Sequence, residues 1–274
     1  MGRPVYGAHG HLFEVDPAPV LSDRVRAALA TLEVLGTEPA GSYVIEDQGH
    51  GFHLSWGDEE VGRRETQDAI LLLLHWHINQ QTIDASTARR TTFHAAAARS
   101  PRGHGILLAA PMESGKTTTV TGLLRAGWDY LTDEAAGVDP DGTVWAYPKP
   151  LTLDHGSWPL FPELEPAGVE SGAGSWLVPA TAAGSRVVAT APLRLVVFPA
   201  YAEGGETLLE RLGQSEAALQ LAHSTFKFDE HGERDLRCVA AIARRVPAYR
   251  LAIGNLDAAV TLLDSADAAL GSTA

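Results

Sequence analysis

Residues 105–132 constrain the fold of this 274-residue chain more than any other segment. An apolar run at 105–109 precedes a short turn, and Gly115-Lys116-Thr117 then opens a segment of helical character that stops before Gly127. A second apolar run follows at 128–132. The order strand, loop, helix over 116–126 and strand predicts an α/β fold.

The turn at 110–117 has the pattern of a phosphate-binding loop of the Walker A type. In such a loop, backbone N–H groups at a helix N-terminus bind phosphate, a lysine reaches the β/γ oxygens and a hydroxyl binds Mg²⁺. Ala110 replaces the first glycine of the pattern, which requires a negative φ there. The predicted nucleotide-binding residues are Pro111, Met112, Glu113, Ser114, Gly115, Lys116, Thr117 and Thr118.

Two adjacent carboxylates, Asp133 and Glu134, follow the second strand directly. If this strand pairs in parallel with the strand before the loop, both strands end at the same edge of the sheet and the carboxylates lie beside the loop. One carboxylate would then hold Mg²⁺ and the other would accept a proton from an attacking hydroxyl. The alternative is that the pair caps a helix beginning at Ala135.

The rest of the chain predicts a mixed sheet with helices on it and a small N-terminal α+β unit. Residues 6–56 contain short strand-like runs, interrupted by a helix over 22–35. A hairpin is expected over 138–147, where Pro-Asp-Gly favours a turn. Further helices are expected at 65–81, 207–222, 235–245 and 256–270, and strands at 193–199 and 248–253. The predicted domains are 1–90 and 91–274.

Charge and cysteine content limit the partners and the compartment. A formal net charge of −13 opposes binding to nucleic acid. The sequence has no apolar run of about 18 residues and no signal peptide, which predicts that it does not enter a membrane. The single cysteine, Cys238, fits a reducing compartment and a buried structural role. We therefore expect a cytoplasmic protein.

Four stretches, at 93–95, 105–119, 124–134 and 147–151, together resemble the HPr serine kinase/phosphorylase group. The similarity extends most closely to the stand-alone HPr-kinase-like proteins, which include lasso-peptide kinases. It covers about residues 92–153 well and 223–263 more loosely. The resemblance implies a P-loop kinase core related to phosphoenolpyruvate carboxykinase over 91–274, with ATP and Mg²⁺ as cofactors.

The same resemblance assigns roles to single residues. It implies that Lys116 binds the β/γ-phosphates, that Thr117 binds Mg²⁺, and that His94 points into the active site. Asp133 and Glu134 fall on a pair of aspartates that serve as metal ligand and base, and which of the two is the base stays open. Glu113 departs from the family pattern, because a glycine is expected in the middle of the loop, and we expect its carboxylate to point outward or to meet a cation.

Three cations, Lys149, Lys227 and Arg234, are candidates for a clamp on the transferring phosphoryl group. A second positive charge would stabilise the negative charge that spreads over the equatorial oxygens in the transition state. For each of them, solvation at the surface is the alternative.

The sequence therefore predicts a kinase that moves the γ-phosphoryl group of ATP to a hydroxyl, with a serine of a peptide or small protein as the leading acceptor. A small-molecule kinase acting on a sugar, amino acid or antibiotic hydroxyl is one alternative. A non-catalytic ATP-binding regulatory module is another, although it would need no base. The resemblance also implies a homo-oligomer, and it gives no support for the phosphorylase reaction, because the associated glycine-rich segment is absent.

Overall fold

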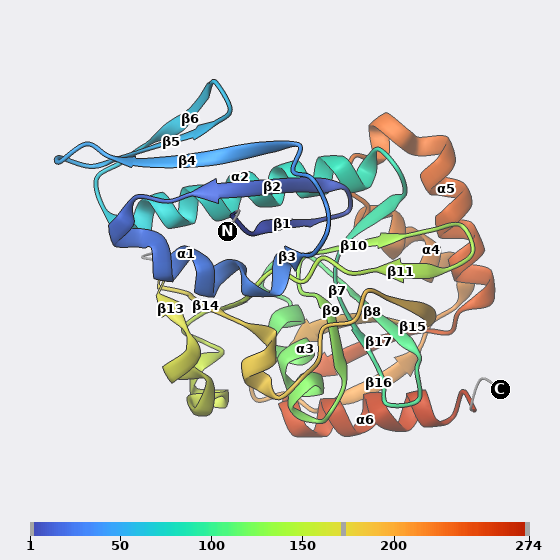
Figure 1. The fold of residues 1–274 in the computed structure, drawn as a ribbon. Coiled ribbons are helices and arrows are strands. Elements are labelled where there is room, and N and C mark those ends of the chain that lie inside the picture. Colours follow the sequence, from blue (N-terminus) through green and yellow to red (C-terminus); the bar gives the residue numbers. More distant parts are fainter. Residues whose placement is uncertain (1–2, 171–173, 272–274) are drawn as a thin grey trace. The chain divides into compact units, whose positions relative to one another are not determined.

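The computed structural model describes residues 3–170 and 174–271 (Figure 1). The chain forms two compact units, one of Met1–Ala85 with Lys149–Ala182 and the other of Ser86–Pro148 with Ala183–Ala274. The division into domains 1–90 and 91–274 stays a prediction.

The first unit is built on a sheet in which only β2 and β4 pair in parallel. Its strands in spatial order are β3 (Glu33–Val34), β1 (Val5–Ala8), β2 (His11–Asp16), β4 (Gly41–Asp47), β5 (Phe52–Trp56) and β6 (Glu59–Arg64). The unit also contains α1 (Ser22–Leu29), most of α2 (Gln67–Thr87), and a small sheet of β12 (Leu151–Leu153), β14 (Trp176–Val178) and β13 (Val169–Glu170). The predicted small N-terminal α+β unit is confirmed.

Both helices of this unit differ in length from the prediction. The helix expected over 22–35 ends at Leu29, because β3 pairs with β1 and takes up the backbone groups of residues 33 and 34. Leu35 is 88% exposed and belongs to no helix face. Conversely, α2 continues six residues beyond the predicted end at Gln81. Its last turns bury Thr82, Ser86 and Thr87, and polar residues of this kind give no apolar periodicity to detect.

The second unit is built on a mixed sheet, which confirms the predicted α/β class. Its strands in spatial order are β11 (Thr143–Trp145), β10 (Ala135–Val138), β7 (Thr91–Arg99), β8 (Gly105–Ala109), β15 (Thr190–Tyr201), β17 (Ala248–Ile253) and β16 (Leu208–Arg211), with β9 (Asp129–Thr132) paired to β7. The neighbours β8, β15 and β17 run parallel, and the other pairs are antiparallel. Every residue of β8 is buried, as expected for a central strand covered on both faces.

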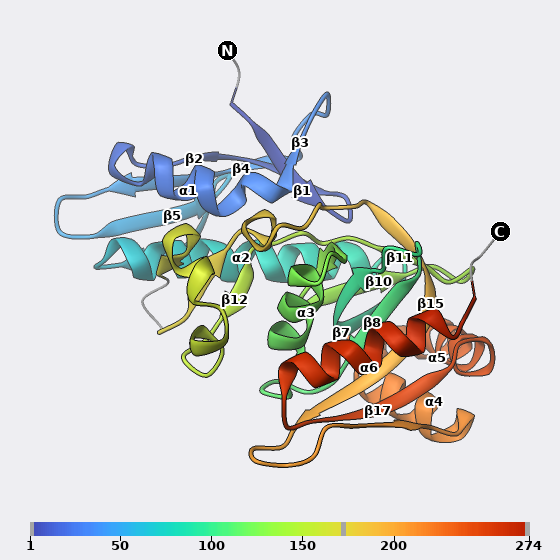
Figure 2. The same cartoon turned by 90° about the horizontal axis from the view of Figure 1, so that it is seen from below.

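Helices cover both faces of this sheet. On one face, α4 (Gln214–His223) and α5 (Phe228–Arg245) bury Leu221 and Val239 in a cluster with Phe93 and Leu107. The residues that alternate with Leu107 point to the other face. There α3 (Lys116–Arg125) packs beside α6 (Leu256–Ala268) (Figure 2).

The predicted helices and strands are confirmed where the sequence signals are local, and one predicted helix is wrong where a segment pairs with a strand distant in sequence. The helices at α3 and α6, the hairpin of β10 and β11, and the strands β15 and β17 are confirmed. The helix predicted over 207–222 was wrong at its start, because 208–211 form β16 on the edge of β17, and α4 begins only at Gln214. The helix predicted from 235 begins at Phe228. Within the described ranges, no helix is long and apolar enough to cross a membrane.

Candidate active site

The loop between β8 and α3 contains two residues with a left-handed backbone conformation. Gly115 has φ 88° and caps α3, a left-handed conformation that glycine adopts without steric penalty. Glu113 also lies in this region, with φ 61°, where a side chain is disfavoured. Ala110 is not among the residues with positive φ, which confirms the requirement set by the sequence. The Glu113 side chain is exposed, as expected for a carboxylate that points outward.

Lys116 lies at the first position of α3 and is only 6% exposed. Its Nζ donates to the carbonyl oxygens of Ala110 and Pro111, at 2.7 and 2.6 Å. Burial lowers the pKa of Lys116, and the charges of Glu134 and Asp133 act in the opposite direction. The ammonium group is therefore held over the loop by neutral acceptors, beside two carboxylates.

The strand before Asp133 reaches the loop by a different route from the one predicted. β9 does not pair with β8; it pairs antiparallel with β7, which lies between them. Because both strands are antiparallel to β7, β8 and β9 still run in the same direction and end at the same edge. β10 then continues along β7, with Ala135 opposite His94. The alternative of a helix beginning at Ala135 is thus excluded, since that residue begins a strand.

Asp133 and Glu134 have different surroundings. Asp133 is 3% exposed, and the hydroxyl of Tyr130 donates to its Oδ1 at 3.0 Å. Burial, followed by the charge of Asp133, raises the pKa of Tyr130 well above its usual value, so the phenol stays protonated and remains a donor. The Glu134 side chain is 31% exposed. The two carboxylates are therefore suited to different tasks.

His94 stands on β7 between the carboxylates and the loop. Its Nε2 is 3.7 Å from Glu134 Oε1, and its ring centroid is 5.6 Å from that of Phe226. Burial and the charge of Lys116 lower the pKa of His94 to about 4, although Asp133 opposes the shift. His94 is therefore neutral near pH 7, and its contact with Glu134 is not an ion pair there.

A cavity of about 380 Å³ opens where β8 ends. It is lined by His94 and the loop residues Ala110 and Pro111, together with residues that the sequence analysis missed: Phe198, Pro199, Ala200, Gln220, His223, Ser224 and Arg250. Arg250 comes from β17 and is held by Glu216 of α4 through a short ion pair. No linear motif marks these residues, because they come from elements about a hundred residues from the loop.

The three candidate clamp residues have different surroundings. Lys149 belongs to the other compact unit, where its Nζ donates to Pro150 O and Thr152 Oγ1, both at 3.1 Å. Lys227 precedes α5 with φ 51°, and its Nζ is 4.0 Å from Glu230 Oε2. Arg234 lines a cavity other than the one at the loop. Their role as a clamp stays a prediction.

The remaining loop residues divide into exposed and half-buried positions. Met112 is 78% exposed, and Ser114 Oγ donates to Pro111 O at 2.8 Å. Thr117 and Thr118 are half-buried in the first turn of α3.

The donors suit Mg²⁺ bound together with phosphate. Mg²⁺ is usually held by one or two carboxylates and completes its octahedron with substrate phosphates and water. The predicted ligands, Thr117 with Asp133 or Glu134, would form such an incomplete set of oxygen donors. Among residues 3–170 and 174–271, no group of three or more His, Cys, Asp or Glu side chains could hold a metal by itself.

Comparison with known proteins gives a distant structural similarity and no match in sequence. No protein-family model matches the sequence, and no curated protein matches it. Among solved structures, the chain is similar to the Hpr(Ser) kinase/phosphatase from Coxiella burnetii, with 13% identity and a TM-score of 0.36 over 65% of this chain and 97% of that chain. A likeness of this size does not assign the chain to a family.

Proposed function

We propose that this chain is an ATP- and Mg²⁺-dependent kinase of the HPr-kinase-like type, which transfers the γ-phosphoryl group to a serine hydroxyl of a peptide or small protein. The observation that carries the proposal is the convergence of Lys116, Asp133, Glu134 and His94 at one edge of the sheet. A site that only sensed ATP would need the loop and a metal contact but no second carboxylate. Two carboxylates of unequal exposure support phosphoryl transfer.

In this proposal the loop binds ATP and the carboxylates divide the chemistry. Lys116 exchanges its two loop carbonyls for β/γ-phosphate oxygens, which are stronger, charged acceptors. Thr117 and Asp133 would hold Mg²⁺, which neutralises charge on the phosphates. The acceptor oxygen attacks the γ-phosphorus as the bond from phosphorus to the ADP oxygen breaks. Glu134 takes the proton of the acceptor hydroxyl, since it is the more exposed carboxylate.

His94 is a positioning group in this scheme rather than a cation. Its neutral ring can donate one hydrogen bond and accept another. It lines the 380 Å³ cavity, so an acceptor hydroxyl bound there would lie between His94 and the loop. The cavity accommodates a side chain or a small molecule, and its residues do not by themselves select between them.

The test compares two carboxamide variants in an assay of acceptor-stimulated ADP release. Glu134→Gln should lower kcat by about 10²–10⁴-fold, the usual contribution of a general base, and leave Mg·ATP binding intact. Asp133→Asn should weaken Mg·ATP binding as well. Glu38→Gln is the matched control, because Glu38 is an exposed acid of the other compact unit. Full turnover in both site variants, or ATP binding without ADP release across peptide and small-molecule pools, would disprove the proposal.

A further inference from the structure

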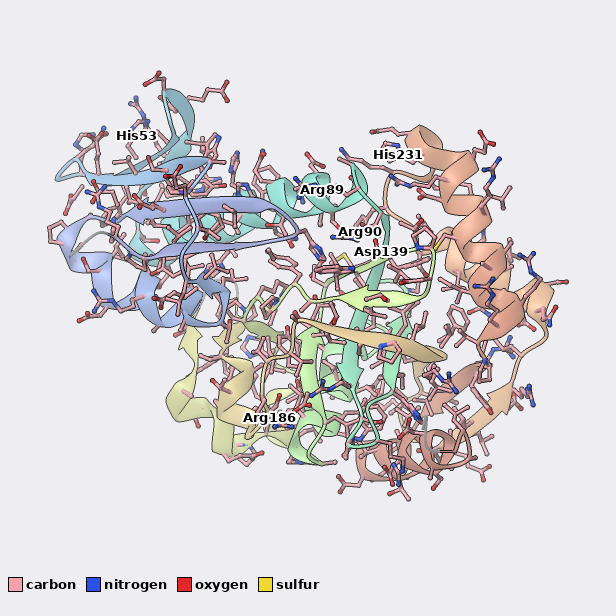
Figure 3. The ribbon with its side chains drawn as sticks, turned by 45° about the vertical axis from the view of Figure 1, so that its right-hand side comes forward. His53, Arg89, Arg90, Asp139, Arg186 and His231 are labelled. Carbon is pink, nitrogen blue, oxygen red and sulfur yellow. The ribbon has the colours of Figure 1, made fainter. Side chains whose placement is uncertain are left out.

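A second cavity, of about 440 Å³, lies where β7 begins and α5 passes over it. Its lining includes four arginines, Arg89, Arg90, Arg234 and Arg237, and one acid, Glu233. Figure 3 labels Arg89 and Arg90 near this end of β7, with Asp139 beside Arg90. In a chain with a net charge of −13, such a concentration of guanidinium groups needs an explanation.

The position of Arg90 is fixed from two sides. Its Nε donates to Asp139 Oδ1 at 3.1 Å, and its Cζ lies 4.5 Å from the centroid of the Trp145 ring. A carboxylate and an aromatic face together restrict both the direction and the tilt of the guanidinium plane. The side chain is 12% exposed, so this group is pre-arranged within the cavity wall.

Arg234 carries the strongest sign of an absent partner. Its Nε donates to Oδ1 of the fully buried Asp235, which also accepts from Thr91 Oγ1 at 2.8 Å. Arg234 Nη2 is buried, and within the described part of the chain it has no acceptor. Asp235 Oδ2 has no donor either. A buried donor without an acceptor is unfavourable. Because the Arg234 side chain as a whole is 33% exposed, a turn of its guanidinium toward an oxyanion in the cavity would supply one.

The remaining arginines lie toward the solvent. Arg237 is 78% exposed and its Nη2 donates to Glu233 Oε1 at 2.5 Å, while Arg89 is also exposed. The cavity thus has guanidinium groups both at its mouth and in its wall, and Asp139, Asp235 and Glu233 each contact one of them. Ligand pockets typically have volumes of about 300–1,000 Å³, and the volume of this cavity falls within that range. The cavity is therefore larger than one inorganic ion requires.

β7 connects this cavity to the proposed active site. Thr91 lines the cavity and His94 lines the cavity at the loop, three residues farther along the same strand. Three residues of a strand span about 10 Å, and the odd spacing places the two side chains on opposite faces. A polypeptide with its hydroxyl beside His94 would cover the length along β7 with about three extended residues, at about 3.3 Å each, and would need further residues to pass the start of β7 to the other face.

We infer that the arginine-lined cavity binds the acidic side chains of a polypeptide, and that this polypeptide is the phosphate acceptor. Guanidinium groups bind carboxylates through paired N–H···O bonds, which gives both charge and geometry. The overall negative field of the chain repels an acidic segment, so recognition must come from this local cluster. The inference rests on the proposed kinase function, and it narrows the acceptor to a serine peptide with acidic residues nearby.

The test measures peptide binding without ATP. Two fluorescein-labelled peptides, one with a serine and four glutamates and one with glutamines in their place, are titrated with the full chain and followed by fluorescence anisotropy. We expect the glutamate peptide to bind at least tenfold more tightly. Arg234→Gln should raise its Kd about tenfold or more, as expected for hydrogen bonds to charged groups. Arg244→Gln removes an exposed arginine of the same helix outside the cavity lining, and should leave the Kd unchanged.

Equal affinity for the two peptides, or an unchanged Kd in Arg234→Gln, would overturn the inference. Displacement of the glutamate peptide by inorganic phosphate is expected, whereas phosphate binding without any peptide binding would show a small-anion site and overturn it. If Arg234→Gln unfolds, Arg237→Gln at the exposed mouth replaces it, with an expected rise in Kd of severalfold. Lys116→Ala should bind the peptide normally and lose phosphoryl transfer. Peptide binding by the wild-type chain with no phosphoryl transfer would refute only the proposed function.

Discussion

Replacing Glu113 by glycine should stabilise the chain. Glu113 has φ 61°, and a residue with a Cβ in this region is less stable by about 1–2 kcal/mol. Glycine removes that strain but increases the conformational entropy of the unfolded chain, which reduces the gain in stability by roughly 0.4–1 kcal/mol. The expected net gain is about 0.5–1 kcal/mol, or a rise in Tm of roughly 1–4 °C for a chain of this size.

The same substitution should strengthen ATP binding, because it also removes a carboxylate from the loop that receives the phosphates. Two like unit charges about 8 Å apart in water repel by roughly 0.5 kcal/mol, and ATP carries several such charges. We expect the Kd for a fluorescent ATP analogue to fall about two- to fivefold, with a smaller effect at high salt.

Glu113→Ala separates the two effects. Alanine removes the charge but keeps a Cβ in the left-handed region, so it should strengthen ATP binding without raising Tm. Thermal unfolding and titration of the three proteins are compared in one buffer. If Glu113→Ala raised Tm as much as Glu113→Gly, the reasoning from backbone strain would be refuted. If neither substitution changed the Kd for the ATP analogue, the reasoning from charge would be refuted.

Three further predictions concern the site and the core. Tyr130→Phe removes the buried hydrogen bond to Asp133 and should lower the free energy of unfolding in urea by about 1–3 kcal/mol, and an unchanged value would contradict that role. His94 has a pKa of about 4 in the folded chain and 6.5 in the unfolded chain. The contribution of its neutral form to the free energy of unfolding is therefore complete above pH 6.5 and is lost as the pH falls toward 4. His94→Gln should therefore remove up to about 3 kcal/mol of the pH dependence of unfolding across that window, and an identical dependence would show that the pKa is not lowered. Leu107→Ala should lower the free energy of unfolding by about 2–5 kcal/mol. Leu35→Ala, at an 88% exposed position, is the control and should change it by less than about 0.5 kcal/mol. Equal effects of the two substitutions would place Leu107 outside the core.

The segment around the loop could be predicted from sequence because its signals are local. An apolar run, a glycine that tolerates φ 88° and a helix stop at Gly127 lie within a few residues of the elements they define. The direction of β9 was also inferred correctly, since both β8 and β9 end at the edge that carries Asp133.

The partner of β9 could not be predicted, because strand pairing depends on contacts distant in sequence. The insertion of β7 between β8 and β9 brings His94 to the carboxylates, and only the resemblance had indicated that histidine. The cavity residues Gln220 and Arg250 come from α4 and β17 and have no motif. For the same reason, the sequence predicts Arg234 as a member of the phosphate clamp, although Arg234 lines a cavity with Arg89 and Arg90.

Transfer of the γ-phosphoryl group from ATP to a serine peptide, followed by mass spectrometry, tests the central claim most directly. The wild-type chain with Mg²⁺ should form the phosphopeptide and ADP together. Lys116→Ala should form it at least about 10²–10³-fold more slowly, because the buried ammonium is the group expected to meet the transferring phosphates. Arg244→Gln, which removes a positive charge elsewhere, should transfer at the wild-type rate. Phosphopeptide formation by Lys116→Ala at the wild-type rate would contradict the account.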